Sequence, residues 1–186
     1  MIAKYVEQEP EVYDEDDLVK FFSKCKPFQL AVFKTLLMSG LRKQELESLT
    51  WDCVDFVSGT LSVRGKPGFT PKDWEERTIE VPSDLLTILK ELPRNGKYVF
   101  ATKTGGKYTH MWDDCNAIAK AAGISGAHPH KFRAHYATWL LQSGFDLKTV
   151  QKLLGHKTIE STMRYLAKAR SPEVRTKMDT VWNGKH

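Results

Sequence analysis

The amino-acid sequence predicts a mainly α-helical domain with a small antiparallel β-sheet on one edge, an α+β fold. Apolar residues recur at helical intervals, in segments that begin at capping residues and end at glycine. Two short β-rich runs, residues 60–63 and 77–81, flank a polar stretch with several glycines and prolines, which is typical of a long hairpin. The chain has 186 residues, 41% of them hydrophobic, so it can bury a core as one large domain.

The N-terminal part is predicted to hold three helices. Residues 1–13 are acidic and are interpreted as the end of a linker. A first amphipathic helix follows an Asp14 cap, and a second covers residues 28–39 and ends at Gly40. The segment 41–51 restarts as a short helix before the hairpin.

After the hairpin, helices are predicted at residues 83–91 and 109–122, with a short strand at residues 98–100 between them. The next segment, residues 127–165, combines polar chemistry with strong helical spacing. His130 and Arg133 are three residues apart and therefore share a helix face. We expect that face to bind an anion.

A turn is predicted to return two further polar side chains to this face. Asp146 is a plausible N-cap for LKTVQKLL, and Gly155 is a natural left-handed helix end. A new helix capped near Thr158 would bring His156 and Tyr165 toward the anion-binding face. A guanidinium beside a tyrosine and histidines favours phosphate chemistry with a tyrosine nucleophile.

Here the sequence also resembles a known family. HPHKFR followed by LLGHKTIESTMRY resembles the second conserved box of the tyrosine recombinases, the phage integrase family. Its pattern is His-x-x-Arg, then Leu-Gly-His, then the nucleophilic tyrosine nine residues later. His130, Arg133, His156 and Tyr165 match these four positions. The histidine that usually follows the box arginine is Ala134 in this chain.

The first box of the family, Gly-Leu-Arg-x-x-Glu-Leu, matches SGLRKQEL. The resemblance implies that Arg42 is the second phosphate-clamping arginine and that Glu45 orients it. It also implies a lysine at the hairpin tip, five residues before an arginine. Lys72 with Arg77 fits this spacing, and Lys66 is the alternative hairpin lysine.

The resemblance covers residues 14–170 and implies the catalytic-domain fold of tyrosine recombinases. The tyrosine would attack a DNA phosphate to form a 3′-phosphotyrosine link, two arginines would clamp the phosphate, and the lysine would protonate the leaving oxygen. One histidine would handle the tyrosine proton and the other would bind a phosphate oxygen, without metal or cofactor. The implied catalytic set is Arg42, Lys72, His130, Arg133, His156 and Tyr165.

Double-stranded DNA is the implied partner, with a chain that is monomeric when free and forms a tetrameric synapse on DNA. Residues 171–186 resemble the family's C-terminal tail, which docks on a neighbouring protomer, although packing on the same molecule is the alternative. Two other functions stay open: DNA relaxation of the type IB topoisomerase kind, and a catalytically idle DNA-binding protein on the same fold.

Charge agrees with a polyanionic partner. Residues 126–186 carry a net charge of +7 and residues 1–17 a net charge of −6, within a total of +5. A basic surface around a phosphate site favours DNA, while an ordinary basic soluble protein explains charge alone equally well.

The remaining features exclude several classes. Cys25, Cys53 and Cys115 form no CxxC pair, so neither a disulfide framework nor a zinc ribbon is predicted, and a cytoplasmic, nucleoid-associated location fits. The clustered histidines lack an HExxH motif, so no metal is predicted. Lys34 interrupts the longest apolar run, which excludes a membrane span there.

Two expectations concern aromatic residues. Trp112, Trp139 and Trp182 are expected to be core or packing aromatics rather than platforms for base stacking, and Tyr136 is expected on the buried face of its helix. Tyr165 has polar sequence neighbours, which suits an exposed nucleophile.

Overall fold

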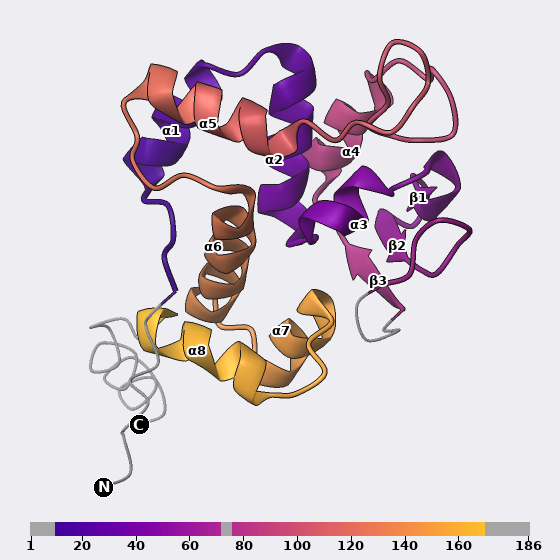
Figure 1. Ribbon diagram of the computed structural model, residues 1–186. Helices are drawn as coiled ribbons and strands as arrows, with labels where there is room; N and C mark the ends of the chain where they lie inside the picture. The colour runs from indigo at the N-terminus through magenta and orange to yellow at the C-terminus, as the bar shows by residue number, and fades with distance from the viewer. Residues whose placement is uncertain (1–9, 72–75, 170–186) are drawn as a thin grey trace, which may run out of the picture.

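The protein is mainly helical, with one small sheet at an edge, as the sequence predicts (Figure 1). The computed structural model describes residues 10–71 and 76–169. Its helices are α1 (Glu15–Ser23), α2 (Pro27–Ser39), α3 (Lys43–Glu47), α4 (Ser83–Lys90), α5 (Met111–Ala122), α6 (Pro129–Gln142), α7 (Leu147–Leu154) and α8 (Glu160–Ala169). Its strands are β1 (Val54–Asp55), β2 (Thr60–Val63) and β3 (Arg77–Glu80), and a 3-10 turn covers Trp51–Cys53.

Local capping explains where the first helices begin and end. Asp14 accepts a hydrogen bond from the backbone N–H of Asp17 at 2.7 Å, which starts α1 at the predicted place. Gly40 ends α2 with φ of 62°, and a Cβ at this position would collide with the ring of Tyr136. The turn after α2 therefore lies directly against α6, where it leads into the first-box arginine.

The sheet has the order β1-β2-β3 and is antiparallel throughout. β2 and β3 are the two predicted strands, and Val63 pairs with Arg77 where the hairpin leaves the sheet. The predicted strand at residues 98–100 is wrong: Tyr98 forms only an isolated bridge with Thr50. The short β1 was not predicted, because two residues show no alternation.

α6 is the central element (Figure 1). It lies between the group formed by α1, α2 and α5 and the pair α7–α8. On one side its Phe132 is fully buried and stacks on Phe33 with ring centroids 5.5 Å apart. On the other side Ala137 and Leu140 form a second, smaller core with α7 and α8. The helix that carries the second box is thus fixed from both sides.

Trp112 and Trp139 are not core residues, and Trp182 lies outside the described residues. Trp112 and Trp139 are 50% and 54% exposed, whereas Tyr136 is buried as predicted. Among the described residues, no helix is long and apolar enough to cross a membrane.

Candidate active site

Arg133 lies at the centre of the site, on the first turns of α6. It is among the largest side chains that are almost fully buried, with 1% exposure. Its Nη2 donates to the carbonyl of Leu154 at 2.6 Å, and its Nη1 donates to the carbonyl of Gly40. Burial, followed by the charge of Arg42, lowers the pKa of this guanidinium from its usual range. The side chain is therefore held by backbone oxygens and has little freedom to turn away.

The turn between α7 and α8 returns the chain to Arg133, as the sequence predicts. Asp146 caps α7 by accepting from the backbone N–H groups of Lys148 and Thr149, both at 3.0 Å. Gly155 ends the helix with φ of 63°. α8 then begins at Glu160, close to the predicted cap.

Arg42 and Glu45 form the second part of the site, at the start of α3. The Arg42 guanidinium donates to Glu45 Oε1 at 2.9 Å, and the Arg42 backbone N–H donates to Oε2 at 2.8 Å. Arg77, from β3, approaches the same carboxylate and donates to both oxygens, at 3.0 and 2.7 Å. Burial raises the pKa of Glu45, but the hydrogen bonds and charge of Arg77 outweigh it and lower the pKa to about 2.

The C-terminal end of α7 connects these arginines. Three successive carbonyls, those of Leu153, Leu154 and Gly155, each accept a hydrogen bond from a different guanidinium, and we call this set the α7 carbonyl cluster. Their donors are Arg77 Nε at 2.9 Å, Arg133 Nη2 at 2.6 Å and Arg42 Nη2 at 2.9 Å. Carbonyls at a helix C-terminus lack intrahelical partners and carry the negative end of the helix dipole, so cations stabilise them.

His156 follows directly on the α7 carbonyl cluster. Its Nδ1 lies 2.8 Å from Oγ1 of Thr162, a fully buried residue of α8. Burial, followed by the charges of Arg133 and Arg42, lowers the pKa of His156 to about 3, so the ring is neutral at neutral pH. In the tautomer that accepts from Thr162 at Nδ1, the proton lies on Nε2 and is available to a ligand oxygen.

His130 lies one helical turn before Arg133, at the start of α6. The residue is exposed, although protein covers part of the ring. This partial burial, followed by the charge of Arg133, lowers the pKa of His130. A neutral imidazole at a solvent-facing position is able to accept a proton.

Tyr165 stacks on His156, with ring centroids 6.1 Å apart and an angle of 12° between the planes. Contrary to the expectation of an exposed nucleophile, it is only 2% exposed and belongs to the second core with Leu154 and Val150. Its polar neighbours Arg164 and Lys168 are exposed, whereas Thr162 shares the buried face of α8 with the tyrosine, and α8 packs on α6. The structure thus brings Tyr165 beside His156, but covers it.

Of the two candidate lysines in the hairpin, the structure describes only one. Lys72, the first choice for the general acid, lies outside the described residues. Lys66 is described, and its Nζ donates to Oγ1 of Thr50 at 2.9 Å and to Sγ of Cys53 at 3.6 Å. These contacts hold Lys66 against the 3-10 turn.

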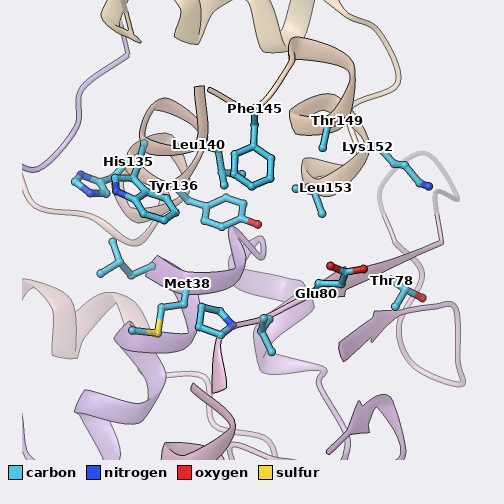
Figure 2. Close-up of a pocket in the computed structure, with 14 residues that line it drawn as sticks. Met38, Thr78, Glu80, His135, Tyr136, Leu140, Phe145, Thr149, Lys152 and Leu153 are labelled. Carbon is cyan, nitrogen blue, oxygen red and sulfur yellow. The ribbon is translucent and has the colours of Figure 1, made fainter. Parts of the chain in front are cut away.

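A cavity of about 770 Å³ lies beside the site, between α2, α6, α7 and the end of β3 (Figure 2). Tyr136 and Phe145 point into it, and Glu80 and Lys152 lie at its edge. Leu153 borders this cavity and also contributes to the α7 carbonyl cluster. The described residues include no group of three His, Cys, Asp or Glu side chains that could hold a metal.

Two residues of the site were not identified as such from sequence. In sequence, Thr162 is only one of several polar residues near the tyrosine, and its place six residues after His156 in the same motif is the signal that could identify it. Arg77 served only to set the hairpin register, and its partners Glu45 and Leu153 are 32 and 76 residues away in sequence.

Comparison with known proteins supports the family indicated by the motifs. The sequence model described as the phage integrase family matches residues 11–171. Tyrosine recombinase XerC of Oceanobacillus iheyensis is 32% identical over 144 residues, which are 73% of this chain and 47% of the relative. Tyrosine recombinase XerA of Pyrococcus furiosus is 31% identical over 157 residues, 80% of this chain and 53% of the relative. The chain therefore spans about half the length of the curated relatives it matches.

Solved structures show the same fold at lower sequence identity. The match to the crystal structure of XerA recombinase spans 96% of this chain and 67% of that chain, with a TM-score of 0.76 and 20% identity. The match to the catalytic domain of bacteriophage HP1 integrase spans 95% of this chain and 97% of that chain, with a TM-score of 0.69 and 22% identity. The sequence motifs, the family match over most of the chain and this shared fold agree, and the chain belongs to the phage integrase family of tyrosine recombinases.

Proposed function

We propose that this chain is the catalytic domain of a site-specific DNA recombinase, which cleaves and rejoins DNA strands through a 3′-phosphotyrosine intermediate. The observation that carries the proposal is the charge of the buried site. Arg42, Arg77 and Arg133 converge on the α7 carbonyl cluster, and within residues 10–71 and 76–169 Glu45 is the carboxylate that bonds to this group, through Arg42 and Arg77. The excess of two positive charges is costly away from water and favours an anion such as a DNA phosphate.

The donors of the two clamping arginines suit a phosphate. A guanidinium has five N–H donors, and the structure shows Arg42 and Arg133 each using two terminal N–H groups on protein oxygens. Their remaining donors would bind the two non-bridging oxygens and neutralise charge that develops during attack.

In the proposed cleavage step, the phenol oxygen of Tyr165 forms a bond to phosphorus and the bond to the 5′-oxygen breaks. His130 takes the phenol proton, which is consistent with a lowered pKa that keeps its ring neutral. His156 donates Nε2–H to a phosphate oxygen. Lys72 gives a proton to the leaving oxygen, and Lys66 is the alternative donor. The 5′-hydroxyl of another strand then attacks the phosphotyrosine, which releases Tyr165 and completes the exchange.

Because Tyr165 is buried against α6, attack would require its hydroxyl to be uncovered. We infer that DNA binding is coupled to a shift of α8, since this helix carries both Tyr165 and the Thr162 contact to His156.

Double-stranded DNA is the proposed partner, with residues 14–170 as the catalytic domain. Solved relatives of the same fold include Tn1549 transposon integrase in complex with a circular intermediate DNA and XerH recombinase bound to its difH substrate. The recombinase and integrase relatives favour strand exchange over simple DNA relaxation. We extend this to a tetrameric synapse on DNA, in which the tail at residues 171–186 docks on a neighbour, and to a place at the nucleoid.

Covalent capture tests the proposal. The chain would be incubated with a library of nicked duplexes, and protein–DNA adduct would be measured on denaturing gels. We expect adduct with the wild type and none with Tyr165→Phe, which loses only the attacking oxygen. Tyr136→Phe, a matched change in the same small core, should still form adduct. Adduct that persists in Tyr165→Phe would contradict the assignment.

A further inference from the structure

Arg77 joins three segments that carry the site. It lies on β3, bonds both carboxylate oxygens of Glu45 at the start of α3, and donates Nε to the carbonyl of Leu153 at the end of α7 at 2.9 Å. It also packs against Gly155, where an added Cβ would lie 2.8 Å from Arg77 Nη1. One planar guanidinium therefore fixes the carboxylate that holds Arg42 and the turn that leads to His156.

Its environment differs from that of Arg42. The Arg77 side chain is 4% exposed, and all three of its nitrogen atoms donate to protein oxygens. The Arg42 side chain is 21% exposed and shares Glu45 with it. Arg77 is thus poorly placed to bind DNA, but it is well placed to orient a residue that does.

We propose that Arg77 is a positioning residue, which holds Arg42 and the Gly155–His156 turn in the arrangement that binds the DNA phosphate. The inference rests on the proposed function and assigns to Arg77 no contact with DNA. Without its fork, Glu45 would lose two of the hydrogen bonds that fix its plane, and the Arg42 guanidinium bonded to it would gain rotational freedom. Donor displacements of about 1 Å are enough to cost about 100-fold in rate.

Lysine cannot replace this arginine fully. An ammonium group keeps the charge, but it is a point donor without the flat fork that spans two carboxylate oxygens and a carbonyl at once. Arg77→Lys is therefore a mild variant that removes geometry more than charge. Arg77→Gln serves as a second variant, and Arg94→Lys, at an exposed arginine, is the matched control.

The test compares two nicked substrates that differ at the scissile phosphate. One carries the normal phosphodiester, and the other carries a methylphosphonate, in which a methyl group replaces one non-bridging oxygen. The second substrate develops less negative charge, so it depends less on the clamping guanidiniums. The readout is the ratio of adduct formation rates, phosphodiester over methylphosphonate. This ratio is independent of the fraction of protein that is folded.

We expect the ratio to fall about 100-fold for Arg42→Ala, which removes a donor, and about 10-fold for Arg77→Lys, which displaces it. Arg94→Lys should keep the wild-type ratio. An unchanged ratio in Arg77→Lys, with wild-type adduct present, would overturn the inference alone. Loss of folding in both Arg77 variants would also overturn it, because the residue would then serve stability only. Absence of adduct in the wild type would overturn the proposed function and this inference with it.

Discussion

Glu45→Gln tests how much the buried charge network stabilises the fold. Glu45 is 4% exposed, and its pKa falls from 4.5 to about 2 because hydrogen bonds and charge from Arg77 outweigh burial. This difference corresponds to about 3 kcal/mol of stability at neutral pH. Removing one partner of a buried pair costs a similar amount, since the other charge is left uncompensated. We therefore expect Glu45→Gln to lower the free energy of unfolding at pH 7 by about 3 kcal/mol.

The pH dependence of this loss has a definite sign. The folded pKa of Glu45 is depressed, so its stabilisation is complete above pH 4.5 and is lost as the pH falls toward about 2. The difference between wild type and Glu45→Gln should shrink to about half at pH 3.

Urea denaturation at pH 7 and pH 3, followed by circular dichroism, measures both values. Glu80→Gln, on an exposed position of β3, is the matched control and should cost less than about 0.5 kcal/mol. A loss below about 1 kcal/mol at pH 7 for Glu45→Gln, or an equal loss at both pH values, would refute the reasoning.

Three further predictions follow from the site. Gly155→Ala should lower the free energy of unfolding by about 1–2 kcal/mol because of its left-handed backbone, and it should also slow adduct formation because the added Cβ displaces Arg77. Thermal melting and covalent capture measure these two effects, and wild-type behaviour in both assays would contradict the packing. DNA affinity should be weak and should fall by about 0.9 in log K per phosphate contact per decade of salt; an affinity insensitive to salt in a filter-binding titration would argue against a backbone site. Lys72→Ala should cleave ordinary DNA poorly and recover on a 5′-bridging phosphorothioate, whose sulfur leaves without a general acid, whereas Arg133→Ala should not recover; rescue of Lys66→Ala instead would assign the acid to Lys66.

The helix boundaries of this protein are set by short-range capping signals and could therefore be predicted well. Asp14 and Asp146 cap their helices, and Gly40 and Gly155 end theirs in the left-handed conformation, as expected from sequence. Each of these signals acts within about one helical turn, so no tertiary contact is needed to recognise it.

The network around Arg77 could not be predicted in this way. Its partners come from α3 and α7, far away in sequence, and a buried arginine looks the same in sequence as a solvated one. Only the packing of β3 against α7 reveals that the guanidinium bridges Glu45 and Leu153. The family motifs indicated Arg42 and Glu45, but not what holds them.

Exposure was the least predictable property. Helical spacing placed Trp139 on the apolar face of α6, yet periodicity does not tell how far a neighbouring helix extends, and the ring is 54% exposed beside the cavity. Tyr165 shows the converse: Arg164 and Lys168 beside it in sequence are exposed, but the tyrosine itself is buried where α8 packs on α6.

The most direct test of the central claim is to locate the covalent bond. Adduct captured on nicked duplex would be digested with nuclease and protease, and the peptides analysed by mass spectrometry. We predict a nucleotide attached through its 3′-phosphate to Tyr165, with the released strand carrying a 5′-hydroxyl. A nucleotide attached to any other side chain, or a released strand that retains the phosphate, would contradict the assignment of Tyr165 as the nucleophile.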